Sequence, residues 1–260
     1  MNTPAKIIAI ANQKGGVGKT TTSINLAASL AAKRKKTLLI DSDPQGNASS
    51  GVGVNTKKMR IHLYHAYSSG FSGNDVRAKT ETKNLDVIPS SIDLAAAEIE
   101  MIEMENRESR LRNIIEPLRG DYDYILIDCP PSLGLLTINA LTAANSVLIP
   151  MQCEYFAMEG LAQLISSIRS VKKGLNKELY IEGLVLTMFD KRNRLTHQVA
   201  SEIKNHFNSQ LFKTVIPRNV RLSECPSHGQ TILDYDKNSS GATAYLNLSK
   251  EFLKNQRKPI

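Results

Sequence analysis

The chain has 260 residues, of which 41% are hydrophobic and 22% are charged, as in a globular protein that can bury one large core. Its apolar runs are shorter than the roughly 18 residues of a membrane span, and its N-terminus lacks the apolar core of a secretory signal, so we expect a cytoplasmic protein. The net charge of +8 falls mainly on residues 171–260, which carry 15 basic and 8 acidic side chains; this surplus favours DNA or an anionic membrane as partner over a merely solvated basic face.

An apolar run at residues 7–11 leads into Gln13-Lys14-Gly15-Gly16-Val17-Gly18-Lys19-Thr20-Thr21, and a helical pattern follows over residues 24–30. A strand, a glycine-rich turn and a helix start in this order are typical of a phosphate-binding loop, whose backbone N–H groups converge on the anion. The pattern predicts that residues 14–21 bind a nucleotide, with Lys19 on the β and γ phosphates and Thr20 on Mg²⁺. The usual motif has glycine where this chain has Gln13, and a second lysine, Lys14, follows at once.

Two further predicted strands end in carboxylates. Residues 37–40 run into Asp41-Ser42-Asp43-Pro44-Gln45-Gly46-Asn47, and residues 124–127 run into Asp128-Cys129-Pro130-Pro131. Ligands bind at the carboxyl ends of strands in an open parallel sheet, so we expect these carboxylates to face Mg²⁺ or the attacking water. An apolar strand ending in Asp128 is the Walker B arrangement, which predicts that Asp128 holds the Mg²⁺ water shell. For Asp41 the alternative is a helix N-cap.

The remaining pattern alternates between strands and helices. Strands are predicted at residues 84–89, 146–150, 181–188 and 214–216, and helices at 92–105, 107–118, 155–171, 196–207 and 242–254, with a further helix through Leu141. Residues 48–83 have only a weak pattern. This alternation predicts an α/β fold with a mainly parallel sheet, helices on both faces, and a single domain over residues 1–260.

Several conspicuous residues are assigned structural roles. The three cysteines are far apart, so burial is expected rather than disulfides or zinc. We expect His62 and His65 at the surface, and the charged residues from Glu98 to Arg112 on a solvated helix face with i,i+4 ion pairs. Gly134 is a candidate for close backbone approach to the phosphate end of the site.

Lys14-Gly15-Gly16-x-Gly18-Lys19-Thr20 resembles the deviant Walker A box of the P-loop NTPase family that includes the ParA and Soj partition ATPases, the MinD division-site ATPases and the nitrogenase iron protein. Asp41-x-Asp43-Pro44-Gln45-Gly46-Asn47 and Asp128-x-Pro130-Pro131 resemble its other motifs, and residues 216–224 are close to Soj and ParA. The resemblance implies that Lys14 crosses a dimer interface to the partner's nucleotide. It also implies that Asp43 orients the hydrolytic water, that Asp41 lies near the metal, and that Lys14, Lys19 and Asp43 are catalytic.

The resemblance further implies an adenine site and a DNA face. Pro217, Arg218 and Asn219 would lie against the adenine, and we place Met188 in the same site. Arg192 and Arg221 would bind DNA without sequence preference. The implied cofactors are ATP and Mg²⁺. The implied partners are a second copy of the chain, non-specific DNA and a ParB-type centromere-binding protein, so that the protein would be associated with the nucleoid.

Two alternatives remain open. A MinD-like ATPase would insert a C-terminal helix into a membrane, whereas Tyr245, Leu248 and Phe252 form a short stripe that better fits core packing. A P-loop enzyme acting on a small molecule would need an acceptor pocket, and metabolites would then stimulate its turnover.

Overall fold

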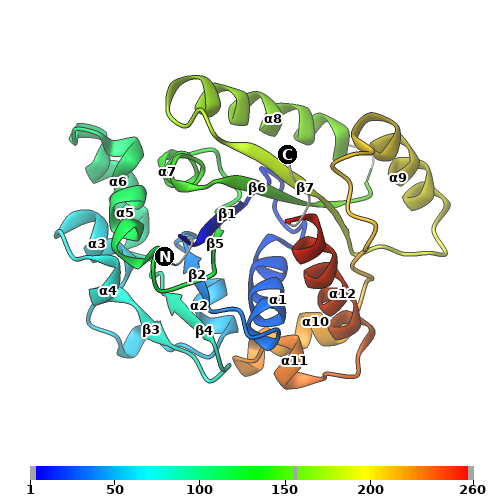
Figure 1. Cartoon of the computed structure of the whole chain (residues 1–260), viewed down its shortest axis with the longest axis horizontal. Coiled ribbons are helices and arrows are strands. Elements are labelled where there is room, and N and C mark those ends of the chain that lie inside the picture. Colours follow the sequence, from blue (N-terminus) through cyan, green and yellow to red (C-terminus); the bar gives the residue numbers. More distant parts are fainter. Residues whose placement is uncertain (1–3, 155–156, 257–260) are drawn as a thin grey trace.

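The structure is a computed structural model that describes residues 4–154 and 157–256. Its strands are β1 (Lys6–Ile10), β2 (Thr37–Asp41), β3 (Ala78–Lys79), β4 (Leu85–Ile88), β5 (Tyr124–Asp128), β6 (Ser146–Gln152) and β7 (Tyr180–Thr187). They form one seven-stranded sheet in the order β3-β4-β2-β5-β1-β6-β7 (Figure 1). Neighbouring strands are parallel except for the edge pair β3 and β4, which is antiparallel.

The α-helices connect these strands. Their bounds are α1 (Lys19–Ala32), α2 (Asn47–Gly51), α3 (Leu63–Ser68), α4 (Gly73–Val76), α5 (Leu94–Glu100), α6 (Arg110–Ile115), α7 (Leu135–Ala143), α8 (Ala157–Gly174), α9 (Arg194–Phe207), α10 (Val220–Glu224), α11 (Ile232–Tyr235) and α12 (Ser240–Asn255). Short 3₁₀ helices lie at Thr56–Lys58, Met101–Glu103, Arg107–Ser109, Glu116–Leu118 and Cys225–His228. Within residues 4–154 and 157–256, no helix is both long and apolar enough to cross a membrane.

The sheet separates two hydrophobic cores. Side chains alternate along β1, so that Ile7 and Ala9 pack with α3 and α5 to α8 on one face, whereas Ile8 and Ile10 pack with α1 and α10 to α12 on the other (Figure 1). The central strands β2 and β5 are buried along their whole length, as expected of strands covered on both faces. The predicted α/β fold with a mainly parallel sheet is therefore confirmed.

Parallel register brings the predicted site residues to one edge of the sheet. Asp128, the last residue of β5, is paired with Ile10 of β1 on one side and with Asp41 of β2 on the other. The loop that begins after β1 thus lies beside both acidic strand ends, as the sequence predicted. The carboxyl edge of the sheet is the place to look for a ligand.

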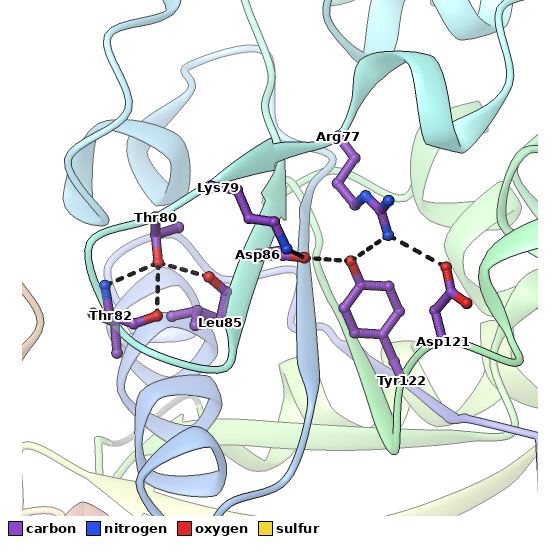
Figure 2. A network of polar contacts seen from close by, with 8 residues as sticks. All are labelled: Arg77, Lys79, Thr80, Thr82, Leu85, Asp86, Asp121 and Tyr122. Atoms are coloured by element: carbon purple, nitrogen blue, oxygen red, sulfur yellow. Dashed lines mark hydrogen bonds and ion pairs between the residues drawn. The ribbon is translucent and has the colours of Figure 1, made fainter.

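The antiparallel edge is held largely by side chains, because β3 has only two residues. Figure 2 shows Arg77 Nη1 donating to Tyr122 Oη (3.0 Å), which in turn donates to Asp86 Oδ2 (2.6 Å). Lys79 Nζ donates to the same carboxylate (2.9 Å). The sequence pattern over residues 48–83 was too weak to predict this edge.

Some predicted elements are wrong in extent or kind. Residues 214–216 do not form a strand; isolated bridges flank them, Leu211 with Leu184 of β7 and Pro217 with Phe189 beyond β7. Ile216 donates to Leu186 O and accepts from Phe189 N, and the regular ladder is broken between these two residues by Met188, which has φ of 47°. The helices expected at 92–105 and 107–118 are shorter and continue as 3₁₀ turns, the second of which contains Pro117. The helix predicted from residue 155 is described from Ala157 onward, because residues 155 and 156 lie outside the described part.

The structure confirms the role predicted for the cysteines and contradicts those predicted for His62 and for the charged residues from Glu98 to Arg112. All three cysteines are buried and free, as predicted. His62, however, is buried and forms a capping box with His65 at the start of α3, so its surface assignment was wrong. The expected solvated i,i+4 pairs are also not found in the described residues: Arg110 and Arg112 donate instead to the backbone oxygens of Tyr67 and Thr142. These arginines connect elements rather than cover a surface.

Helix α12 packs into the core, as the sequence favoured. Tyr245, Leu248 and Phe252 are buried in the core shared with α1, and Tyr245 Oη lies 3.2 Å from Thr22 Oγ1 of α1. The apolar stripe of the helix is therefore covered by protein. Arg257 and Lys258, the basic residues that follow this helix in the sequence, lie outside the described residues.

Candidate functional site

The loop between β1 and α1 is fixed from both sides. Gly18 precedes α1 with φ of 83°, a left-handed conformation that glycine adopts without strain. Asn12 donates from Nδ2 to the oxygen of Pro150 (2.8 Å) and accepts from Lys14 N (3.0 Å). Thr187, at the end of β7, donates from Oγ1 to Val17 O (2.7 Å). The loop is thus anchored to β6 and β7 before any ligand is bound.

The two lysines of the loop have different surroundings. Lys19 is only 7% exposed and donates from Nζ to Lys14 O (3.2 Å). Burial lowers the pKa of its ammonium group, while the negative charges of Asp128 and Asp43 oppose that shift. Lys14 is exposed and forms an ion pair with Glu154 at the surface. One lysine therefore points into the acidic centre and the other away from it.

Asp128 is the most deeply buried acid of the site. It is fully buried, and its Oδ1 accepts from Ser23 Oγ (2.7 Å), whereas its Oδ2 has no hydrogen-bond partner among the described residues. Burial, together with the negative charge of the nearby Asp41, raises the pKa of this carboxyl to about 7, whereas Ser23 and Thr20 act in the opposite direction. A buried carboxylate oxygen without a donor fits a cation or an ordered water.

Asp41 is also fully buried, and both of its oxygens are engaged. Its Oδ2 accepts from the backbone N (2.7 Å) and Oγ (2.6 Å) of Ser49, and its Oδ1 accepts from Asp43 N (3.3 Å). Ser49 is the third residue of α2, so Asp41 accepts from an N–H of the first turn of that helix. The N-cap residue itself is Gly46, and Asp41 is therefore not the N-cap that the sequence left open as an alternative. Burial raises the pKa of Asp41 to about 6, against the effect of these hydrogen bonds.

Asp43 lies at the same edge with one oxygen available. It is 8% exposed, and its Oδ1 accepts from Gln45 N (2.9 Å) in a local turn. Its Oδ2 has no protein donor in the described part of the chain, so it can orient a small ligand such as water. In residues 4–154 and 157–256, no three His, Cys, Asp or Glu side chains form a metal site by themselves.

A cavity of about 250 Å³ adjoins the loop. It brings the predicted base-binding residues beside the phosphate loop, and it is lined by Gly18, Thr21, Thr187, Met188, Ile216, Pro217, Arg218, Asn219, Leu222, Ser223, Pro226 and Tyr245. Met188 has φ of 47°, an uncommon backbone conformation for this residue type, directly after β7. The side chain of Asn219 caps α10 by accepting from Leu222 N (3.2 Å) and donates to Ser240 Oγ (2.7 Å).

The two arginines predicted to bind DNA are both at the surface. The Arg192 side chain is 92% exposed and pairs with Asp190 (3.3 Å). The Arg221 side chain is 54% exposed and pairs with Glu224 (2.9 Å) and Asp236 (3.5 Å). Their exposure permits contact with a large anion, but each would exchange an existing carboxylate partner for it.

Gly134 is closely approached by another group, as predicted, but this group is a protein side chain. A Cβ at Gly134 would lie 2.3 Å from Glu98 Oε1, and this oxygen accepts from Leu136 N (3.2 Å) at the start of α7. The glycine therefore makes room for the Glu98 carboxylate rather than for a phosphate. This corrects the expectation from the sequence.

Sequence reasoning missed four residues that support the site: Asn12, Ser23, Ser49 and Thr187. Only Ser23 had a usable signal, because it lies four residues after Lys19 and thus on the same side of α1. Thr187 contacts the loop from a point 170 residues away in the chain, whereas Asn12 and Ser49 lie only 2 and 8 residues from the groups that they bind. Short polar side chains of this kind carry no pattern of their own.

Comparisons with known proteins agree with this site. A family model described as an AAA domain matches residues 5–181. The chain is 56% identical to the sporulation initiation inhibitor protein Soj of Bacillus subtilis over 96% of this chain and 99% of that protein. It is 54% identical to the chromosome partitioning protein ParA of Myxococcus xanthus over 97% of this chain and 89% of that protein.

A solved structure with the same fold is cobyrinic acid a,c-diamide synthase from Mycobacterium smegmatis, with a bound ATP analogue and magnesium. It matches with a TM-score of 0.85 and 31% sequence identity, over 98% of this chain and 96% of that one. Identity to the partitioning proteins is considerably higher and extends over nearly the whole chain. The chain therefore belongs to the ParA/Soj family of chromosome-partitioning ATPases.

Proposed function

We propose that this ATPase moves DNA cargo by cycling on and off the nucleoid. ATP and Mg²⁺ bind at the loop of residues 14–21, with the base in the cavity formed by Met188 and residues 217–219. The ATP-bound chain forms a homodimer that holds DNA without sequence preference, and slow hydrolysis, stimulated by a ParB-type partner, releases it. The bound ATP analogue and magnesium of the related synthase support the choice of cofactors.

The donors at the carboxyl edge of the sheet fit Mg²⁺. The Thr20 hydroxyl and the unpartnered Oδ2 of Asp128 are oxygen ligands of the kind that this ion accepts, directly or through water. Asp41 remains a candidate for the same shell, although the three donors on its oxygens favour a role in holding α2. Bound Mg²⁺ would neutralise phosphate charge and remove the cost of burying Asp128 as an anion.

The position of Lys14 is the observation that carries the dimer proposal. Lys19 alone occupies the acidic centre, and Lys14 is held at the surface by Glu154, a bond that a stronger anion can replace. In the proposed dimer, Lys14 reaches the triphosphate of the other subunit. Nucleotide binding then controls dimerisation, because Lys14 reaches a triphosphate only across the dimer interface.

Hydrolysis requires a water in line with the bond to the γ phosphate. Asp43 is the proposed group that orients this water, because it has a free carboxylate oxygen beside the edge that Lys19 reaches. Lys14 and Lys19 stabilise the charge that develops on the transferred phosphoryl group. We expect ATP hydrolysis to be slow, because a single carboxylate orients the water and Lys14 is supplied by the other subunit.

Dimerisation would also double the DNA contacts. Each phosphate contact releases counterions, with a slope of about −0.9 in log affinity against log salt, so two copies of Arg192 and Arg221 bind far more tightly than one. An ATP dimer therefore stays on the nucleoid, and a monomer leaves it. A partner bound at centromere-like sites would set where release happens.

Variants of the loop lysines test the nucleotide-dependent dimer. We expect Lys19→Ala to lose ATP binding, and Lys14→Ala to bind ATP but remain a monomer in gel filtration. Gly15→Val is a second dimer variant: a Cβ at Gly15 meets nothing within 4 Å in the monomer, so valine spares the ATP site and obstructs only a crossing lysine. An ATP-dependent dimer of both Lys14→Ala and Gly15→Val would contradict the proposal.

A further inference from the structure

The segment between β4 and α6 exposes three large aliphatic side chains. Ile92, Ile99 and Ile102 are 68%, 72% and 54% exposed, and we name them the isoleucine ridge. Ile92 lies in the turn before α5, Ile99 in α5 and Ile102 in the 3₁₀ turn after it, and their spacing of seven and three residues places them on one side of this segment. The opposite side packs into the core through Leu94, Ala97 and Met101. A helix that is apolar on both sides has a second surface to cover.

The segment that carries the ridge is acidic, and the first cation after it, Arg107, is already paired with Glu108 and donates to Ile102 O (2.6 Å). Residues 91–106 contain no lysine or arginine and five acids, namely Asp93, Glu98, Glu100, Glu103 and Glu105. An acidic rim around an apolar patch selects a basic, amphipathic partner and disfavours DNA or an anionic lipid surface. A second copy of this chain related by a two-fold axis through the ridge would set these carboxylates against each other.

Hydrogen bonds connect this segment to both acidic loops of the nucleotide site. Ser90 N donates to Ser49 Oγ (3.0 Å), and Ser49 Oγ donates to Asp41 Oδ2 (2.6 Å). Eight residues further on, Glu98 Oε1 accepts from Leu136 N (3.2 Å), just after the turn that follows Asp128. A ligand on the ridge therefore touches elements that hold the loops after β2 and β5.

The ridge is also accessible when the basic face is occupied. In Figure 1, α5 lies on the opposite side of the molecule from α9 and α10. Arg221 belongs to α10, and Arg192 lies just before α9. A partner can thus reach the ridge while the chain is bound to DNA.

We propose that the isoleucine ridge docks a basic amphipathic segment of the protein that stimulates hydrolysis, and that Glu98 passes this docking on to the loop after Asp128. This inference rests on the proposed function. Leucine-like side chains of the segment cover the ridge, and its lysines and arginines meet the acidic rim. A cation drawn to Glu98 competes with Leu136 N for the carboxylate, which shifts residues 130–136 at the nucleotide site. Glu98 is thus a positioning residue.

A binding assay tests the surface directly. The probe is a fluorescein-labelled synthetic peptide of about 20 residues, with leucines at helical spacing and lysine or arginine between them. We expect the triple variant Ile92→Ser, Ile99→Ser and Ile102→Ser to weaken binding by at least about tenfold in fluorescence anisotropy. Glu103→Lys with Glu105→Lys should weaken it too. Val220→Ser is the matched control, because Val220 is 70% exposed on α10. Unchanged binding to the triple variant would overturn the docking site.

A second assay measures ATP turnover with the ParB-type protein from the same cell. The triple serine variant should keep its basal rate and lose stimulation, and the Val220→Ser control should keep both. Glu98→Ala should lower the stimulated kcat without raising the partner concentration needed for half of the effect. Glu98→Gln should keep the basal rate, because its amide oxygen can still accept from Leu136 N, but it should lower stimulation as well, because it has no charge to draw the partner's cation. Full stimulation of Glu98→Ala would overturn the coupling.

The outcomes separate this inference from the proposed function. Stimulation of the wild type and of the triple variant alike would refute the ridge and leave the partition function standing. If the wild type is not stimulated at all, the proposed function fails, and the peptide assay still decides whether the ridge docks a basic segment. Loss of the ATP-dependent dimer in the triple variant alone would assign the ridge to a second copy, which contradicts the proposal.

Discussion

At the scale of single residues, three carboxyl groups are buried close together, and a bound cation can offset the free-energy cost of ionising them. Asp41, Asp43 and Asp128 lie together at the ends of adjacent strands, and burial raises the pKa of Asp128 to about 7 and that of Asp41 to about 6. The opposite charges of Lys19 and Asp128 attract each other, but burial lowers the pKa of Lys19. Burial therefore shifts the carboxyl groups of Asp41 and Asp128 toward their protonated forms.

The raised pKa values of these buried carboxyl groups predict how the stability of the folded protein changes with pH. The pKa values of Asp41 and Asp128 are raised above the roughly 4 of an unfolded chain, so the folded state holds protons that the unfolded state releases. The stability that these groups contribute is fully present below about pH 4 and is lost as pH rises through 6 to 7. We expect Asp128→Asn to reduce this loss by at least about 1 kcal/mol, near the value of one pKa unit. Urea unfolding in EDTA without nucleotide measures it.

The asparagine is a conservative control for packing, because its Oδ1 can still accept from Ser23 Oγ. The difference between the two proteins should be small near pH 4 and large near pH 8. Parallel stability curves for wild type and Asp128→Asn across this range would show that Asp128 ionises freely in the folded protein.

Asp43 gives a second prediction at this scale. We expect Asp43→Ala to trap an ATP-bound dimer on DNA and to lower turnover by about 100-fold or more, the lower range for a lost general base. Asp43→Asn separates charge from structure, since its Oδ1 can still accept from Gln45 N. Phosphate release at saturating ATP measures turnover, and a near-normal rate in either variant would remove Asp43 from the proposed role.

At the scale of elements, the sequence predicted the helices and strands that have a clear hydrophobic pattern. It missed the elements that depend on contacts between residues far apart in the chain. Strands such as β5 are continuous apolar runs that end in an acid, and they were placed within a residue or two. The two-residue strand β3 depends on the side-chain network around Asp86 and Tyr122, and no local pattern encodes that network. Residues 214–216 look like a strand, but the left-handed conformation of Met188 interrupts the ladder that they would join, so only isolated bridges flank them.

The same distinction applies within the site. The phosphate loop and the acidic strand ends were visible because spacing alone indicates their chemistry, and the base cavity was predicted only through resemblance. Glu98 was interpreted as part of a solvated run, because a capping bond to Leu136 N across 38 residues leaves no mark in composition. Its role became visible only when α5 was placed beside the start of α7.

Helix α12 provides a prediction that tests an element as a whole. Phe252 is 1% exposed, and its ring centroid lies 5.5 Å from that of Tyr124 in β5. Because the side chain is in the core, Phe252→Ala should cost about 3–5 kcal/mol in urea unfolding. Lys250→Ala, on the exposed side of the same helix, should change stability by less than about 0.5 kcal/mol. A membrane helix would behave differently: Phe252→Ala would fold normally and lose sedimentation with anionic vesicles.

At the scale of the whole molecule, the basic surplus and the acidic segment that carries the isoleucine ridge belong to different parts of the chain. The basic surplus belongs to residues 171–260, whereas the acidic segment around the isoleucine ridge belongs to residues 91–106. The nucleotide edge lies between them and contacts both: Thr187 and Met188 on one side, and Ser90 and Glu98 on the other. This arrangement suits a protein that must sense DNA and a protein partner at the same time.

Salt dependence tests the proposed DNA face at this scale. Arg192 and Arg221 are exposed but paired with carboxylates, so DNA must displace Asp190, Glu224 and Asp236 from them. We expect Arg192→Gln and Arg221→Gln each to flatten the slope of log affinity against log salt by about 1.8 in the ATP dimer, because each removes two phosphate contacts of about 0.9. Lys57→Gln, an exposed lysine outside residues 171–260, should leave the slope unchanged. Fluorescence anisotropy with a duplex of random sequence measures this.

Charge reversal makes the test more stringent. Arg192→Glu or Arg221→Glu adds repulsion to the lost contact and should abolish binding at physiological salt, while gel filtration with ATP still shows a dimer. A variant that loses the dimer as well would act on nucleotide binding, which is a real possibility for Arg221 because α10 also borders the base cavity through Leu222 and Ser223. Unchanged duplex binding after both reversals would move the DNA contact elsewhere on the basic C-terminal third. The proposed cycle would then need a different surface to couple pairing to the nucleoid.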